Sequence, residues 1–219
     1  MTFYSIPPWN EFTTQLRYLP AFSVCSAIYE DEGILVVDKH KGAEVTEELL
    51  SELNSIHSPL FAVHRLDANT EGVCVFAKNE LRHDELSELF YHHKVKKIYH
   101  AILVGEDLPN EGRLVNYAKK EGEGMVLCKK EEAGALRMEL AYKILQRREG
   151  LSKAEIELIT GRTHQIRVQF AAINHPILGC DRYGDYAENR KRRCKTQQLL
   201  SKRLTIEGRT FESLKELCL

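Results

Sequence analysis

The chain has 219 residues, a formal net charge of −1 and 43% hydrophobic residues. This composition is typical of a folded chain with a substantial core, arranged as one large domain or two small ones. It contains no stretch of about 20 apolar residues, so we expect no membrane-spanning helix and no membrane partner. The N-terminus has no basic start followed by an apolar run, so we expect no secretory signal.

The cysteine pattern bears on metal binding and on compartment. The six cysteines lie at positions 25, 74, 128, 180, 194 and 218, and no two of them form a CxxC pair. This spacing favours neither a disulfide framework nor a zinc site. We therefore expect no metal centre, and free thiols of the kind found in a reducing compartment indicate the cytoplasm.

Several short apolar runs predict strands. Residues 33–39 (GILVVDK) and 72–78 (GVCVFAK) are bounded by turn residues, as buried strands are. Residues 98–105 are rich in β-branched and aromatic side chains. Further along, residues 138–146 and 152–160 alternate in polarity around a hairpin turn expected at 147–150.

Three helices are predicted between these strands. The first covers residues 46–56, with Thr46 as N-cap, and the second covers residues 80–94. The third begins after Thr163, its expected N-cap, and extends to residue 172. The side chains expected on their apolar faces are Leu49, Leu50, Leu53, Ile56, Leu86, Leu89, Phe90, Ile166, Phe170 and Ile173, and Asn174 and Pro176 are expected to end the third helix. Strands outnumber helices and do not alternate with them one for one. The pattern therefore predicts an α+β domain with a mixed, largely antiparallel sheet core and flanking helices.

Three segments carry candidate functional residues, and each also has an ordinary structural interpretation. The first is HRLDANTEG (64–72), where Asp67 and Asn69 are also typical of a turn. The second is KIYHAILVG (97–105), where Tyr99 fits a core strand. The third is GRTHQIRVQFAAINHPILGCDRYG (161–184), a pattern that also fits a helix N-terminus followed by a loop.

Together, in this order, the three segments resemble the signature of the RluA family of pseudouridine synthases. The family pattern is HRLDxxTSG, then K-x-Y-x-A-x-V-x-G, then GRTHQIRxH and PIxGDxxYG. Residues 29–42 also resemble the family's opening segment, and the similarity extends over residues 28–204. It implies a pseudouridine synthase fold, a catalytic domain at 28–219 and an N-terminal extension at 1–27. We expect a single catalytic domain without an S4-like RNA-binding domain.

The resemblance implies a reaction that gains no atom and needs no cofactor. The bond between uracil N1 and ribose C1′ is broken, and uracil C5 is then joined to C1′. By resemblance Asp67 is the catalytic residue, and it either attacks carbon or removes the C2′ proton. Arg167 is implied as its guanidinium partner, Tyr99 as the residue that stacks on the base and serves in loss of the C5 proton, and Ile166 as an apolar wall.

The target base must leave its stack to be reached, and the family's arginine at the position of Arg65 enters the RNA stack beside it. A salt bridge that holds the Asp67 loop is the alternative for Arg65. The other substrate-binding residues expected from the resemblance are His64, Thr163, His164 and Gln165.

Two basic clusters flank these motifs, although the overall charge argues weakly against a nucleic-acid partner. One is Lys94, Lys96 and Lys97; the other runs from Arg182 to Arg203. Either alone is more simply a solvated charged surface, whereas two beside a candidate site favour phosphate contact. The residues expected to bind RNA are Lys97, Arg162, Arg192 and Arg193.

The sequence departs from the family pattern at five positions outside the expected catalytic trio. They are Glu71 for Ser, His40 for Pro, Gln169 for His, Asn174 for Gly and Cys180 for Asp. We expect a monomeric isomerase acting on ribosomal or transfer RNA. A synthase specific for transfer RNA, or one that acts on both RNAs, is one alternative. The others are a catalytically silent RNA-binding module on the same fold and, with no support from metal ligands or an oxyanion site, a hydrolase.

Overall fold

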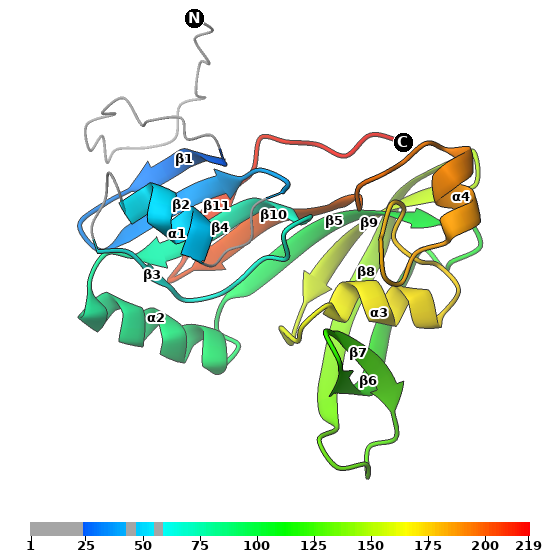
Figure 1. Cartoon of the computed structure of the whole chain (residues 1–219), viewed down its shortest axis with the longest axis horizontal. Helices are drawn as coiled ribbons and strands as arrows, with labels where there is room; N and C mark the ends of the chain where they lie inside the picture. Colours follow the sequence, from blue (N-terminus) through cyan, green and yellow to red (C-terminus); the bar gives the residue numbers. More distant parts are fainter. Residues whose placement is uncertain (1–23, 43–46, 55–58) are drawn as a thin grey trace, which may run out of the picture.

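The computed structural model describes residues 24–42, 47–54 and 59–219 (Figure 1). The strands are β1 (Cys25–Glu30), β2 (Ile34–Lys39), β3 (Phe61–Ala62), β4 (Glu71–Ala77), β5 (Lys96–Val104), β6 (Glu111–Glu121), β7 (Gly124–Cys128), β8 (Leu136–Arg148), β9 (Leu151–Leu158), β10 (Leu199–Ile206) and β11 (Arg209–Glu212). The helices are α1 (Glu47–Asn54), α2 (Glu80–Tyr91), α3 (Gln165–Ala172) and α4 (Tyr186–Lys191). Within these ranges no helix is long and apolar enough to cross a membrane.

The strands form one long sheet in the order β1-β2-β4-β10-β5-β9-β8-β6-β7, with β3 paired to β4 and β11 to β10. All of the strand pairs are antiparallel except β4 with β10. In Figure 1, α1 and α2 accompany one half of this sheet, and α3 and α4 accompany the other. The predicted α+β class with a mixed, largely antiparallel sheet is confirmed.

The two halves of the sheet meet at β10, which lies between β4 and β5. Leu200 and Ser201 pair with Glu71 and Gly72 in parallel, while the other edge of β10 pairs antiparallel with β5. Gly72 has φ of 109°, and a Cβ there would lie 2.2 Å from the carbonyl oxygen of Ser201. A glycine is therefore required at this crossing.

Alternate residues of β2 enter two different cores, as the pleat of a strand dictates. Leu35 and Val37 pack in the cluster that contains Leu49 of α1, Tyr99 and residues of α3. Ile34 and Val36 pack in the cluster that contains Leu86 of α2. Burial on both faces explains why the run at 33–39 is continuously apolar.

Most predicted elements lie where the sequence placed them. The β8–β9 turn consists of Glu149 and Gly150, both with positive φ, which matches the twist of a tight hairpin. Ile166 and Phe170 face the core, and Ile173 packs partly against it. Thr46 and Ile56 lie outside the described residues, and β1 takes in Cys25 to Ala27, which the predicted boundary had assigned to the N-terminal extension.

One expectation needs correction, and one stretch contains elements that were not predicted. The N-cap of α3 is His164 rather than Thr163; it has φ of 51° and makes no side-chain capping bond. The basic stretch at 182–203, for which no helix or strand was predicted, contains α4 and the first part of β10. Lys202 interrupts the apolar pattern of β10, which is why the strand was not predicted. Its Nζ donates to the carbonyl oxygens of Ser213 and Lys215 while its stem is buried.

The β1–β2 turn depends on Asp31. Its carboxylate accepts hydrogen bonds from the backbone N–H groups of Gly33 and Ile34, both at 2.8 Å, and from the Tyr29 hydroxyl at 2.9 Å. Arg209 Nη1 lies 2.9 Å from Asp31 Oδ2. Burial works against the charge, but these donors lower the pKa of Asp31 to about 2.

We predict that Asp31→Asn lowers the free energy of unfolding by about 1–2 kcal/mol at pH 7. The folded pKa lies below the ordinary value of 3.8, so the carboxylate stabilises the fold above that pH and its contribution is lost as pH falls toward 2. Urea unfolding at pH 7 and pH 3 measures this. Glu32→Gln, in the same turn, is the control and should change stability by less than about 0.5 kcal/mol; an equal loss at both pH values would contradict the account.

Candidate active site

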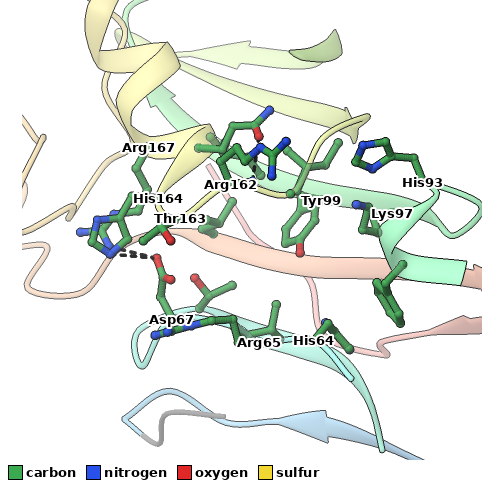
Figure 2. A pocket seen from close by; sticks show the side chains of 18 of the residues that line it. His64, Arg65, Asp67, His93, Lys97, Tyr99, Arg162, Thr163, His164 and Arg167 are labelled. Atoms are coloured by element: carbon green, nitrogen blue, oxygen red, sulfur yellow. Dashed lines mark hydrogen bonds and ion pairs between the residues drawn. The ribbon is translucent and has the colours of Figure 1, made fainter. Parts of the chain in front are cut away.

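A cavity of about 550 Å³ lies between segments that are distant in sequence (Figure 2). Its walls come from residues 63–70, from the end of α2 and the start of β5, from the 158–167 segment that enters α3, and from Leu199 of β10. This volume is within the range of about 300–1,000 Å³ that is usual for small-molecule pockets. A second cavity of about 450 Å³ shares Arg65, Asp67, Thr163, His164 and Arg167 with the first.

Asp67 lies on a tight turn before β4. The N–H of Thr70 donates to the Asp67 carbonyl at 2.9 Å, and the Ala68 carbonyl accepts from the N–H of Gly42 and from Lys39 Nζ, both at 3.0 Å. Burial lowers the pKa of Lys39 to about 8. The turn predicted from Asp67 and Asn69 is therefore present, and it leaves the Asp67 side chain 22% exposed to the cavity.

Arg167 holds the Asp67 carboxylate from α3. Its Nη1 lies 3.0 Å from Asp67 Oδ2, its Nη2 pairs with Asp181, and its Nε donates to Cys180 Sγ at 3.4 Å. The guanidinium also lies over the Tyr183 ring, 5.3 Å from its centroid. Burial opposes the charge, but Cys180 and Asp67 raise the pKa of Arg167, so this buried cation is fully partnered.

Tyr99 projects from β5 into the middle of the cavity, between the Asp67 and Lys97 ends in Figure 2. Burial raises the pKa of Tyr99 above its usual range, and the nearby Asp67 adds to this, whereas a hydrogen bond with Ser201 opposes it. The residue is therefore a neutral phenol with an apolar face toward the cavity.

His164 links Asp67 to Tyr183. Its Nδ1 lies 3.1 Å from the Tyr183 hydroxyl, and its Nε2 lies 3.7 Å from Asp67 Oδ2. Burial lowers the pKa of His164, which favours the neutral ring. Because a carboxylate only accepts, the His164 proton is assigned to Nε2, facing Asp67, and Nδ1 then accepts from the Tyr183 hydroxyl, whose oxygen also accepts from the Met125 N–H at 2.9 Å.

The other expected substrate residues divide into two groups. Arg65, Thr163 and Ile166 line the cavity, and Arg65 and Thr163 are exposed. His64 and Gln165 also line it but are engaged with the protein. His64 Nε2 accepts from the Val75 N–H at 3.1 Å, and its ring stacks on Phe90 with centroids 4.7 Å apart.

Burial lowers the pKa of His64 to about 3, so its ring is neutral. The Gln165 side chain donates to the Glu139 carbonyl at 3.0 Å. It accepts from the Thr160 hydroxyl at 2.8 Å and from the Arg162 N–H at 3.0 Å. These contacts fix the 160–165 segment against β8.

The residues expected to bind RNA are not all in one place. Lys97 and Arg162 line the first cavity. Arg192 and Arg193 line neither cavity, and Arg192 Nε pairs with Glu188 Oε1 at 2.6 Å while its Nη2 donates to the Glu149 carbonyl. The structure therefore separates Arg192 and Arg193 from the site, whereas Arg182, at the start of the same cluster, lines the second cavity.

Two of the departures from the family pattern, Cys180 and Glu71, make polar contacts near the site. Cys180 accepts from Arg167, and the adjacent Asp181 supplies the carboxylate instead. Glu71 pairs with Lys41 and Lys215 at 3.2 and 3.6 Å.

The remaining three departures have local structural explanations. The His40 N–H donates to the Val24 carbonyl at 2.8 Å, a bond that proline could not make. Gln169 Nε2 donates to Asn116 Oδ1 at 2.8 Å and so ties α3 to β6. Asn174 has φ of 62°, a conformation that Asn tolerates in place of Gly.

Several residues of the site had no role predicted from the sequence. Among them are Tyr91 and His93, which line the first cavity, Asp181, which lines the second, and Tyr183, which contacts His164 and Arg167. Asp181 and Tyr183 fall inside the third quoted segment, so the motif itself was the available signal. Tyr91 and His93 fall at the end of a predicted helix, where nothing in the sequence distinguishes a cavity wall from a surface.

In the described parts of the chain, no group of three His, Cys, Asp or Glu side chains could hold a metal ion.

Known proteins resemble this chain in sequence and in fold. The family described as RNA pseudouridylate synthase matches residues 28–172. Ribosomal large subunit pseudouridine synthase D of Buchnera aphidicola is 32% identical over 186 residues, which are 78% of this chain and 58% of that protein. tRNA pseudouridine synthase C of Vibrio cholerae is 31% identical over 186 residues, 74% of this chain and 75% of that protein.

The fold comparison agrees. The structure of human RNA pseudouridylate synthase domain containing 1 matches with a TM-score of 0.75 at 24% identity, covering 88% of this chain and 83% of that chain. At that identity the likeness shows the fold. The chain spans little more than half the length of several curated relatives, between 52% and 60%. With the family match extending over most of its length and the signature motifs meeting in one cavity, the chain belongs to the family of RNA pseudouridylate synthases.

Proposed function

We propose that this protein is an RNA pseudouridine synthase that isomerises a uridine within ribosomal or transfer RNA in the cytoplasm. The observation that carries the proposal is the Asp67–Arg167 ion pair beside Tyr99 in one cavity. A silent RNA-binding module would have no use for a partly exposed carboxylate held by a buried guanidinium. The relatives named for large-subunit ribosomal RNA and for transfer RNA support both substrate classes.

Each step of the isomerisation has a residue suited to it. The target uridine enters the cavity, with Ile166 and Tyr99 providing apolar surface for the base and Arg65 replacing it in the RNA stack. Asp67 then acts at the ribose, either on carbon or on the C2′ proton, as the N1–C1′ bond breaks. Arg167 orients the carboxylate, and the freed uracil turns so that C5 bonds to C1′.

The reaction ends when C5 loses its proton and N1 gains one, so the product is an isomer of the substrate. Burial keeps the Tyr99 phenol neutral. Its hydroxyl can therefore act on the C5 proton only as a relay that passes its own proton onward. No atom is added, and the chemistry needs neither metal nor cofactor.

We expect Asp67→Asn to lower the rate of isomerisation by at least about 10²–10⁴-fold, because the amide can neither attack carbon nor accept a proton. The measurement is tritium release from total RNA labelled at uridine C5, prepared from cells that lack the gene. Asp107→Asn makes the same chemical change at an exposed position outside both cavities and should retain activity. An active Asp67→Asn enzyme, or an inactive wild type, would refute the proposal.

Tyr99→Phe keeps the ring but removes the hydroxyl. If the hydroxyl relays the C5 proton, tritium release should fall by about 10²–10⁴-fold while RNA affinity stays at the wild-type level. Filter binding and tritium release on the same RNA separate the two quantities. Full turnover by this variant would leave Tyr99 as an apolar platform for the base.

Tyr183 is proposed as a positioning residue that acts through His164. Tyr183→Phe should lower kcat about tenfold with little change in KM, because the His164 proton is no longer fixed toward Asp67. His164→Gln carries its own side-chain donor, so in that background Tyr183→Phe should cost much less. Equal losses in both backgrounds, measured by steady-state tritium release, would reduce Tyr183 to a packing role.

A further inference from the structure

The first cavity extends well past the catalytic pair. Asp67 and His164 lie at one end in Figure 2, His93 and Lys97 at the other, and Tyr99 between them. The far end is built from the last turn of α2, the start of β5 and residues 161–162. None of these groups is needed to act on the ribose held at Asp67.

This far end is electropositive and lacks compensating acids. Three groups that can carry positive charge line it: His93, Lys97 and Arg162. Among the described residues, no carboxylate forms an ion pair with any of them, whereas His92, Lys96 and His164, which are close to them in sequence, each have an acidic partner. Lys97 is only 8% exposed, and its Nζ has no hydrogen-bond partner among those residues.

The three groups are close enough to act on one another. Burial lowers the pKa of Lys97, and Arg162 adds to the effect. Burial likewise lowers the pKa of His93, with further contributions from Lys97 and Arg162. Such mutual repulsion in a partly buried wall is relieved by a bound anion.

An aromatic ring stands beside this charge. Tyr91, the last residue of α2, is 76% exposed and yet lines the cavity. His93 follows with φ of 55°, which reverses the chain so that its own side chain also faces the cavity. An exposed tyrosine beside cations is the combination by which proteins hold single-stranded nucleic acid, through base stacking and phosphate contact.

We propose that this end of the cavity binds the nucleotide adjacent to the target uridine, with Lys97 and Arg162 on its phosphodiester and Tyr91 against its base. The proposal rests on the proposed function and extends it, because a uridine held at Asp67 remains joined to its neighbours and one of them must pass over the cavity wall. Stacking tolerates any base, so the subsite contributes affinity and register rather than base identity.

The stacking part is tested with a fluorescein-labelled nine-residue oligouridylate and fluorescence anisotropy. Tyr91→Ala should weaken binding about tenfold, and Tyr91→Phe should restore most of it, because the ring and not the hydroxyl stacks. Leu81→Ala is the matched control: Leu81 is on the same helix, is 72% exposed and lines neither cavity. Its affinity should equal that of the wild type.

The phosphate part is tested by salt dependence. The slope of log affinity against log salt should become shallower by about 0.7 in Arg162→Gln, which corresponds to one lost phosphate contact on a single strand. Lys143→Gln removes one charge from an exposed position of β8 outside both cavities and should leave the slope unchanged.

In tritium release, the effects of Tyr91→Ala and Arg162→Gln should fall on KM rather than on kcat. An active wild type whose affinity and KM are the same in Tyr91→Ala and Arg162→Gln would overturn this subsite and leave the proposed function standing. The subsite is also refuted if Leu81→Ala weakens binding as much as Tyr91→Ala. A wild type that releases no tritium would instead count against the proposed function.

Discussion

The ion pair between Asp67 and Arg167 is the interaction on which the site depends. It joins a turn before β4, in one half of the sheet, to α3, which packs on the other half. The two side chains are a hundred residues apart in sequence. A guanidinium buried to this degree is tolerable only while its carboxylate partners stay in place, so the pair constrains the relative position of the two halves.

The surroundings of this pair limit what else can vary. The buried Lys39 holds the Asp67 turn through its hydrogen bond to the Ala68 carbonyl. Arg167 is held by its contacts with Cys180 and Asp181. Asp181 takes the carboxylate role one position after the place where the family pattern has its aspartate. With Cys180 in place of aspartate, the Arg167 guanidinium therefore still has a partner at each of its three nitrogens. This explains why the site keeps its geometry although a motif position has changed.

Local patterns predicted the elements whose burial is simple. The continuous apolar run of β2 and the alternating runs of β8 and β9 each reflect which faces of the strand are buried. The Glu149–Gly150 turn follows from residue types that accept positive φ.

Strand β10 was not predicted because it contains Lys202 and Arg203. Only their tertiary partners make these charged side chains acceptable in a strand. The cap of α3 was misassigned because His164 is placed by Tyr183 and not by helix chemistry. Motif order indicated Asp67, Tyr99 and Arg167, whereas the cavity wall at Tyr91 and His93 depends on the packing of α2 against β3 and β4.

The central place of β10 has a consequence for the timing of assembly. Its neighbours β4 and β5 come earlier in the chain, but in the described sheet no strand pairing joins them until residues 199–206 lie between them. A nascent polypeptide can form the hairpins on either side through local contacts, but closing this gap is a long-range event. Pairing between the half of the sheet that carries the Asp67 turn and the half on which α3 lies therefore depends on one of the last strands to be synthesised.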